Sequence, residues 1–189
     1  MHLFSTYYFF SEILSGIGEA VRSRGYDMLL ILQSPAEPAD YLKLFRSQKV
    51  DACVILGSRD VPGERDSLRQ LAEHALPFCL VNQSYEGESF SEVDADHVSG
   101  SFLAVRHLIE SGCSNIAFLN GSPQYSNSGA RLEGYRRALS QSELLYREEW
   151  VIQGNYSRKK AATNPSRPLR HTGRSCTLSL RRTTGWRSG

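Results

Sequence analysis

The chain has 189 residues, and 40% of them are hydrophobic, which is enough to build a core and excludes a wholly disordered protein. The formal net charge of +2 hides an asymmetry. Residues 1–150 contain 13 Lys and Arg against 20 Asp and Glu, whereas residues 151–189 contain 9 basic residues and no acidic ones. The body is thus acidic and the tail basic, and a basic stretch of this kind is one feature of a nucleic-acid-binding arm.

Targeting signals and metal-binding motifs are not apparent. The beginning of the chain lacks the basic residues and long apolar run of a secretion signal, and no segment reaches the length of a membrane span. The four cysteines are widely spaced and indicate neither a zinc site nor a disulfide framework. We therefore expect a cytoplasmic protein with no membrane partner, no metal and no cofactor.

The spacing of apolar residues predicts alternating helices and strands along the chain. Amphipathic helices are predicted, in chain order, at 11–24 (with Ser11 as N-cap and Gly25 as the stop), 34–48, 64–75, 96–112 and 127–141. Short apolar runs of strand length are predicted at 26–32, 50–56, 77–83, 115–122 and 150–154.

This alternation predicts an α/β fold. Strands that are apolar throughout, each followed by a helix, are typical of a doubly wound parallel sheet that is covered on both faces. Ligands of such sheets bind beyond the carboxyl ends of the strands. We therefore expect a binding site in the loops that follow residues 32, 56, 81 and 119.

Several segments in order resemble the effector-binding domain of lactose-repressor-type (LacI/GalR) bacterial transcriptional regulators. "YFFSEILSGIGEAVRSRGYDMLLI" is similar to the family's N-P-[FY]-F-x-x-[IL]-x-x-G-[IV]-x-x-x-A-x-x-x-G-Y segment, and "KVDACVIL" to its R-V-D-G-[IV]-I-[IL]. "VDADHVSGSFLAVRHLIESGCSNIAFLNG" is similar to D-N-x-x-G-x-x-x-A-x-x-H-L-[IL]-x-x-G-H-x-x-I-A, and "RLEGYRRAL" to R-x-x-G-[FY]-x-x-A-[LM]. The resemblance covers residues 7 to about 157.

The resemblance implies a periplasmic-binding-protein-like fold of two doubly wound subdomains, with an effector bound between them. It implies that Arg131, of the R-x-x-G-[FY] motif, hydrogen-bonds that effector; on its own, an arginine early in a helix is more often solvated. We expect Arg131 in the first turn of its helix, after a loop-like start at 127–130. A guanidinium suits paired hydroxyls or a carboxylate, because it presents a rigid fork of donors.

The resemblance also offers weaker candidates for effector contacts. Phe9 and Phe10 stand where the family places stacking aromatics, although side chains at a helix start can equally enter a core. Asp96 matches the acid of the D-N pair, and Ser128 precedes Arg131 closely enough to donate to a ligand. Loop serines usually bond their own backbone instead.

The sequence departs from the family pattern at three places. Tyr7-Tyr8 replaces the family's Asn-Pro, His97 replaces the asparagine of D-N, and Asn82-Gln83 replaces Asp-Arg, so a charged pair near the cleft is missing. A histidine at the start of a helix is more often exposed or capping than catalytic. No catalytic motif is found, and an enzyme is not expected.

The resemblance divides the chain into three parts. Residues 1–96 are expected to form an N-terminal subdomain without most of its first strand, and 97–157 part of a C-terminal subdomain. Residues 158–189 are expected to be a disordered basic tail. Reading plausible codons for 177–189 one base earlier recovers "HAVFAANDRMAIG", which is similar to a family segment, so we hypothesise a frameshift near Lys159 and Lys160.

The predicted function is effector binding, with a sugar or similar small molecule as partner, by a truncated domain of a transcriptional repressor. The intact form is expected to be a homodimer that binds operator DNA through a helix-turn-helix, which we do not expect within these 189 residues. Alternatives are a transport-type periplasmic sugar-binding protein, a non-functional pseudogene product, and a fragment that pairs with an intact paralogue.

Overall fold

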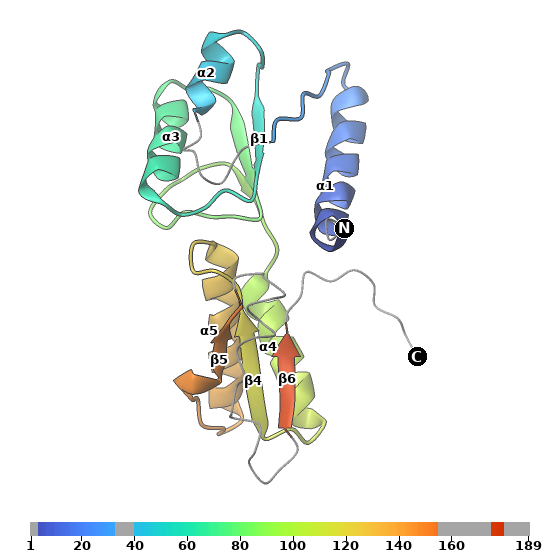
Figure 1. The fold of residues 1–189 in the computed structure, drawn as a ribbon, viewed down its shortest axis with the longest axis vertical. Helices are drawn as coiled ribbons and strands as arrows, with labels where there is room; N and C mark the ends of the chain where they lie inside the picture. The colour runs from blue at the N-terminus through green and yellow to red at the C-terminus, as the bar shows by residue number, and fades with distance from the viewer. Residues whose placement is uncertain (1–3, 33–39, 155–174, 180–189) are drawn as a thin grey trace. The chain divides into compact units, whose positions relative to one another are not determined.

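The structure, a computed structural model, describes residues 4–32, 40–154 and 175–179, and of residues 4–9 and 175–179 only the backbone. The chain divides into two compact units. One consists of Met1–Pro35 with Leu180–Gly189, and the other of Ala36–Ser179. Figure 1 shows the ribbon and labels the elements.

The first unit contains the helix α1 (Phe4–Arg22) and an extended segment at residues 26–32. The predicted start of this helix at Ser11 is wrong: the helix begins seven residues earlier, because no proline or glycine interrupts residues 4–10. Gly25 ends it as expected, since its φ of 78° is a conformation that glycine adopts at low cost.

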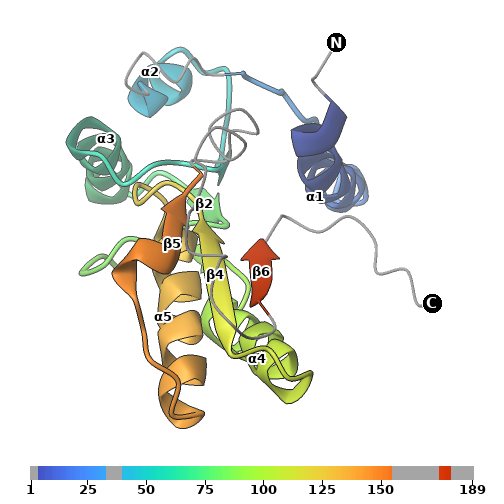
Figure 2. The same cartoon turned by 60° about the horizontal axis from the view of Figure 1, so that its bottom comes forward.

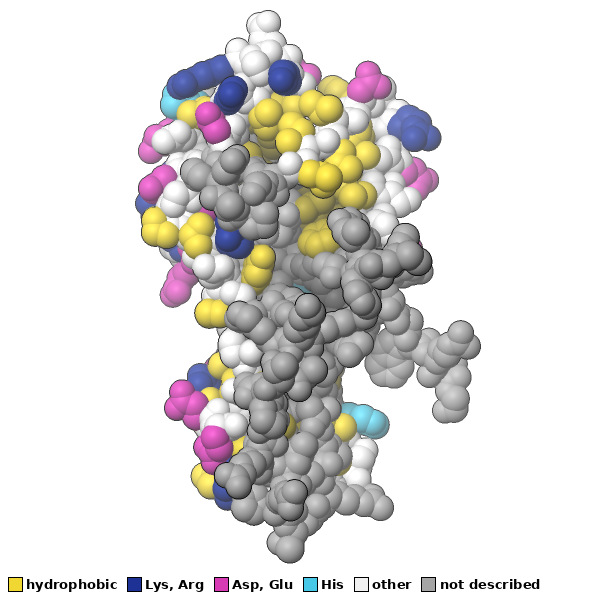
Figure 3. All heavy atoms as spheres, viewed as in Figure 1, with side chains coloured by type: hydrophobic (Ala, Val, Ile, Leu, Met, Phe, Trp, Pro, Cys, Tyr) yellow, Lys and Arg dark blue, Asp and Glu magenta, His cyan; other side chains and the backbone are white. Residues whose placement is uncertain are grey.

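The predicted strand at 26–32 is not formed. These residues are extended but belong to no sheet, and large side chains such as Leu29 and Leu32 are exposed. An apolar run becomes a strand only when a neighbour accepts its backbone hydrogen bonds. Figure 3 shows hydrophobic side chains gathered at the molecular surface.

The second unit begins with a first subdomain, defined here as residues 40–93. It contains α2 (Tyr41–Arg46), β1 (Cys53–Leu56), α3 (Pro62–Glu73), β2 (Phe78–Val81) and β3 (Glu92–Val93). The strands form one parallel sheet in the order β1-β2-β3. Both helices lie on the same side of this sheet in Figure 1. The sequence predicted all of these elements except the two-residue strand β3.

The core of the first subdomain lies between its sheet and its helices. Leu68 and Leu71 of α3 and Leu80 of β2 are fully buried. Tyr41 donates a hydrogen bond of 2.5 Å to a carboxylate oxygen of the buried Glu64, which ties α2 to α3. Burial and this carboxylate raise the pKa of Tyr41 well above its usual range.

The second subdomain is defined as residues 97–154 with strand β6. It contains α4 (His97–Glu110), β4 (Asn115–Asn120), α5 (Ser126–Gln141), the 3-10 helix η1 (Glu148–Trp150), β5 (Val151–Gln153) and β6 (Ser175–Ser179). Its parallel sheet has the order β5-β4-β6. Helices α4 and α5 pack against each other on one face of it (Figures 1 and 2).

The expectation of a disordered tail over 158–189 is wrong for residues 175–179. These residues form β6, which pairs in parallel with β4 from Asn115 to Leu119. An edge strand gains backbone hydrogen bonds whatever its side chains are, so a neighbouring sheet edge can order a segment with no apolar pattern. The rest of the predicted tail beyond residue 154 lies outside the described residues.

The described cysteines include both free and disulfide-bonded ones. Cys53 and Cys79 are free and half-buried, and burial raises the pKa of the Cys53 thiol. Cys113 is disulfide-bonded, which the wide sequence spacing of the cysteines did not predict.

Candidate functional site

Arg131 lies in the second turn of α5, not in its first turn as predicted. The helix begins at Ser126, so the loop-like residues 127–130 are helical. The side chain of Arg131 is half-buried, and its Nε donates to Nδ1 of His97 over 3.4 Å. Within the described part of the chain, the two terminal nitrogens of Arg131 have no hydrogen-bond partner.

The glycine of the R-x-x-G-Y motif allows α5 to reach its position. A Cβ on Gly134 would lie 2.2 Å from the carbonyl oxygen of Val98 and 2.8 Å from Cβ of Ser101. Only a residue without a side chain permits such an approach of α4 to α5. Ser101 Oγ then donates to the carbonyl oxygen of Arg131 over 2.7 Å, which fixes the backbone of Arg131.

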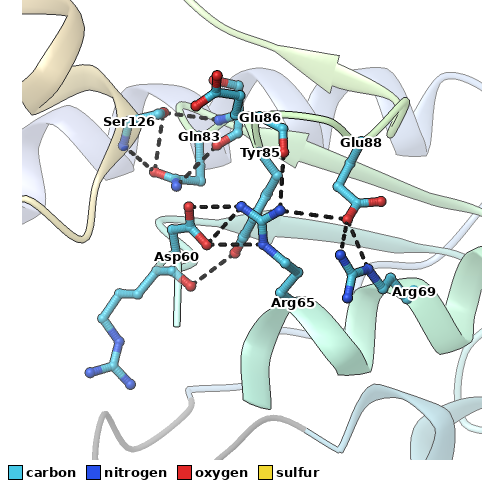
Figure 4. A network of polar contacts seen from close by, with 10 residues as sticks. Asp60, Arg65, Arg69, Gln83, Tyr85, Glu86, Glu88 and Ser126 are labelled. Carbon is cyan, nitrogen blue, oxygen red and sulfur yellow. Dashed lines mark hydrogen bonds and ion pairs between the residues drawn. The ribbon is translucent and has the colours of Figure 1, made fainter. Parts of the chain in front are cut away.

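The beginning of α5 is held by the loop that follows β2. Ser126 N–H, the first amide of the helix, donates to Oε1 of Gln83 over 3.0 Å, and Ser126 Oγ donates to the same oxygen over 3.3 Å. Ser84 N–H donates to Ser126 Oγ over 3.0 Å. Figure 4 shows this set of bonds. Gln83 is fully buried and so replaces the side-chain cap that Tyr125, the N-cap residue, does not provide.

An ion pair and hydrogen bonds connect the loops that follow β1 and β2. Arg65 of α3 binds Asp60 in the loop after β1 at 2.9 Å and donates to the carbonyl oxygen of Glu86 at 3.0 Å (Figure 4). Tyr85 OH donates to the carbonyl oxygen of Arg59 at 3.0 Å. These bonds connect the loops at the carboxyl ends of two parallel strands, where the sequence predicted the binding site.

Asn82 is a candidate that the sequence analysis did not select. It is 5% exposed, its φ is 62°, and among the described residues its Nδ2 has no hydrogen-bond partner. Its carbonyl oxygen accepts from Nδ2 of Asn127 over 3.4 Å. A buried donor without an acceptor is unfavourable unless a ligand or water completes it. The signal in the sequence was the Asn82-Gln83 departure from the family's Asp-Arg pair.

Ser128 faces a cavity in the second subdomain. It is fully buried and lines a space of about 330 Å³ together with Asn120, Leu132, Arg136 and Gln153 among others. Arg131 is not among the residues that line this space.

Asp96 serves as the N-cap of α4. Its carboxylate is exposed and accepts from Ser99 N–H over 2.9 Å. This backbone bond lowers the pKa of Asp96. A capping role and an effector contact are compatible, because a carboxylate has further acceptor sites. Asp96 remains a prediction as a ligand-binding residue.

The two phenylalanines lie within α1 and not before it. Phe10 is half-buried, and the side chain of Phe9 lies outside the described residues. Both belong to the first unit, whereas Arg131, Asp96 and Ser128 belong to the second. Their roles as effector contacts also remain predictions.

The described residues contain no group of three or more His, Cys, Asp or Glu side chains placed to hold a metal ion. In the same part of the chain, no helix is long and apolar enough to cross a membrane.

The family match and the curated relatives of this chain point to one family. Residues 5–171 match the family described as "Periplasmic binding proteins and sugar binding domain of LacI family". The chain is 27% identical over 155 residues to the HTH-type transcriptional repressor PurR of Vibrio campbellii, with 80% of this chain and 46% of the relative covered. The chain thus spans about half the length of the curated relatives that it matches.

Solved structures of regulators have the same fold. The transcription regulator CcpA of Lactococcus lactis has a TM-score of 0.71 and 27% identity, over 80% of this chain and 56% of that one. The CelR–cellobiose complex has a TM-score of 0.68 and 29% identity, over 78% of this chain and 45% of that one. The sequence match, the parallel sheets and these structures together show that the chain belongs to the LacI-type family of periplasmic-binding and sugar-binding domains.

Proposed function

We propose that this chain is the small-molecule-binding part of a LacI-type transcriptional repressor and that Arg131 is its principal ligand-binding residue. Its relatives are transcriptional regulators and not enzymes, and they do not favour the transport-type alternative. The observation that carries the assignment to Arg131 is its half-buried guanidinium, which His97 holds at Nε while both terminal nitrogens have no partner among the described residues.

The chemistry of the available groups favours a ligand rich in oxygen acceptors. The terminal nitrogens of Arg131 and Nδ2 of Asn82 are donors, and none of them has an acceptor in the described residues. Hydroxyl and carbonyl oxygens of a sugar or a purine complement such donors. A related regulator was solved as a complex with cellobiose, so a neutral sugar is the first ligand to test.

The intact regulator is proposed to be a cytoplasmic homodimer that binds operator DNA through a separate headpiece. Effector binding would change operator affinity only to the extent that the effector binds two states of the dimer differently. This chain covers the effector side of that coupling.

The proposal is tested with a ligand panel and a matched pair of variants. Cellobiose, ribose, other neutral sugars and purine bases are screened by thermal shift, and binders are measured by calorimetry. Arg131→Ala should weaken binding by roughly tenfold or more, as expected for loss of hydrogen bonds from a charged group. The control is Arg137→Ala on the same helix, an exposed residue whose Nε pairs with Glu133 at 2.7 Å.

The control should bind like the wild-type chain. If Arg131→Ala and Arg137→Ala bind a ligand equally well, Arg131 is not the ligand-binding residue. If no member of the panel binds the wild-type chain, the proposed effector class is wrong.

A further inference from the structure

Three side chains form a line from the segment that joins the two subdomains to Arg131. Asp94 follows β3, His97 begins α4, and Arg131 lies on α5. Asp94 Oδ1 is 2.9 Å from Nε2 of His97, and Nδ1 of His97 is 3.4 Å from Nε of Arg131. The His97 side chain is 11% exposed, and that of Asp94 is 19% exposed. The line is therefore largely shielded from water.

The contact with Arg131 assigns the donor and acceptor roles of the histidine ring. Arginine Nε can only donate, so Nδ1 of His97 must accept, and the proton of the neutral ring lies on Nε2. Nε2–H then donates to Asp94, which also accepts from Ala95 N–H at 2.8 Å. A neutral imidazole with its proton on Nε2 makes both of these contacts, whereas an imidazolium has no lone pair to accept from Arg131.

We propose that His97 is a positioning residue that holds Arg131 for its ligand only while the imidazole is neutral. This inference rests on the proposed function of Arg131. Protonation places an N–H opposite the N–H of Arg131 and a positive charge beside the guanidinium. Arg131 then moves away from His97, and the ligand affinity falls in acid. Histidine is suited to this role because it titrates near neutral pH.

The surrounding charges set the direction of the effect. Asp94, in the joining segment, attracts a protonated His97, whereas Arg131 on α5 repels it. Asp96, in the same joining segment, accepts from Ser99 N–H. Protonation therefore strengthens the bond to Asp94 and breaks the bond to Arg131. His97 therefore contacts Arg131 at neutral pH and loses this contact in acid.

The first experiment needs no ligand. The chain is labelled with nitrogen-15, and the ring nitrogens of His97 and the Nε–H of Arg131 are followed by nuclear magnetic resonance from about pH 8 to about pH 5.5, the range in which histidines titrate. We expect the Nε2–H form at high pH, with slow exchange of Arg131 Nε–H, and loss of that protection as His97 becomes protonated. An Nδ1–H form at high pH would overturn the proposal.

The second experiment measures affinity for cellobiose, or for the neutral sugar that the panel identifies, so that the ligand itself does not titrate. Wild-type affinity should fall roughly three- to tenfold between the two pH values, the effect of one hydrogen bond. His97→Gln keeps an acceptor but does not titrate, and its affinity should be independent of pH. The control His107→Gln, an exposed histidine in the last turn of the same helix, should retain the wild-type profile.

The two experiments test different statements, so each can give a negative result without the other. If His97→Gln keeps the pH dependence of the wild-type chain, His97 does not regulate the site. If no sugar or purine binds, the proposed effector class is wrong and the effect of pH on affinity cannot be measured with it. The resonance measurement still decides whether His97 holds Arg131.

Discussion

Replacing Gly134 by alanine tests the packing that positions Arg131. The added Cβ would lie 2.2 Å from the carbonyl oxygen of Val98 and 2.9 Å from the backbone nitrogen of Phe102, both on α4. A separation below 3.0 Å is essentially never observed for a Cβ. Because both contacts are with backbone atoms, no change of rotamer relieves them. The two helices have to move apart.

The magnitude follows from two opposing effects. Overpacking a tight interface destabilises by about 1 to 3 kcal/mol, and a clash with backbone belongs at the upper end. Alanine stabilises a helix by about 1 kcal/mol relative to glycine. We therefore expect Gly134→Ala to lower the free energy of unfolding by about 2 kcal/mol, as the difference of these two effects.

The measurement is urea unfolding followed by circular dichroism, with Gly129→Ala as the matched control. Gly129 lies on the same helix, and a Cβ there meets nothing within 4 Å. Gly129→Ala should raise the free energy of unfolding by up to about 1 kcal/mol. If both variants have the same stability, α4 and α5 do not approach as closely as described, and the account of the R-x-x-G-Y glycine is refuted.

Three further predictions concern buried polar groups. Gln83→Ala removes the acceptor of Ser126 N–H; it should lower the free energy of unfolding by about 1 to 3 kcal/mol and speed hydrogen exchange of that amide. Gln83→Glu keeps the acceptor and should keep the Ser126 amide protected from exchange. Equal exchange rates in the two variants would contradict the capping role. Tyr41→Phe leaves Glu64 buried without its donor, so urea unfolding should show a loss of about 1 to 3 kcal/mol, and an unchanged midpoint would be the contrary result. Burial raises the pKa of Tyr135 to about 12, so its neutral form stabilises the fold below pH 10 and this contribution is lost as the pH rises toward 12; Tyr135→Phe should show a smaller loss of stability over that interval, and an identical pH dependence would disprove the assignment.

Much of the fold could be predicted because apolar periodicity reports burial directly. β4 and α3 lie close to their predicted ranges, since each has one buried face or is buried on both faces. β3 escaped prediction because two exposed residues, Glu92 and Val93, carry no pattern and pair only because β2 offers an edge. For residues 26–32 the apolar pattern is strong, but among the described residues this segment belongs to no sheet.

The candidate site was less predictable because its contacts join residues distant in sequence. The motif identified Arg131, but the acceptor of its Nε is His97, which the sequence suggested only as an exposed or capping residue. The sequence singled out Gln83 only because it replaces a charged family residue. In the structure, its side chain accepts a hydrogen bond from the amide of Ser126, 43 positions away. Such pairings depend on the tertiary fold, and a single sequence contains no direct signal of them.

The bond from Gln83 to Ser126 has a consequence for any rotation of one subdomain relative to the other. The opening amide of α5 is satisfied by a side chain from the other subdomain, so rotation of one subdomain away from the other strips that amide of its acceptor. Unwinding of the first turn of α5 and separation of the subdomains are thus thermodynamically linked. A mutation that stabilises the first turn of α5 without Gln83 would lower the free-energy cost of separating the subdomains.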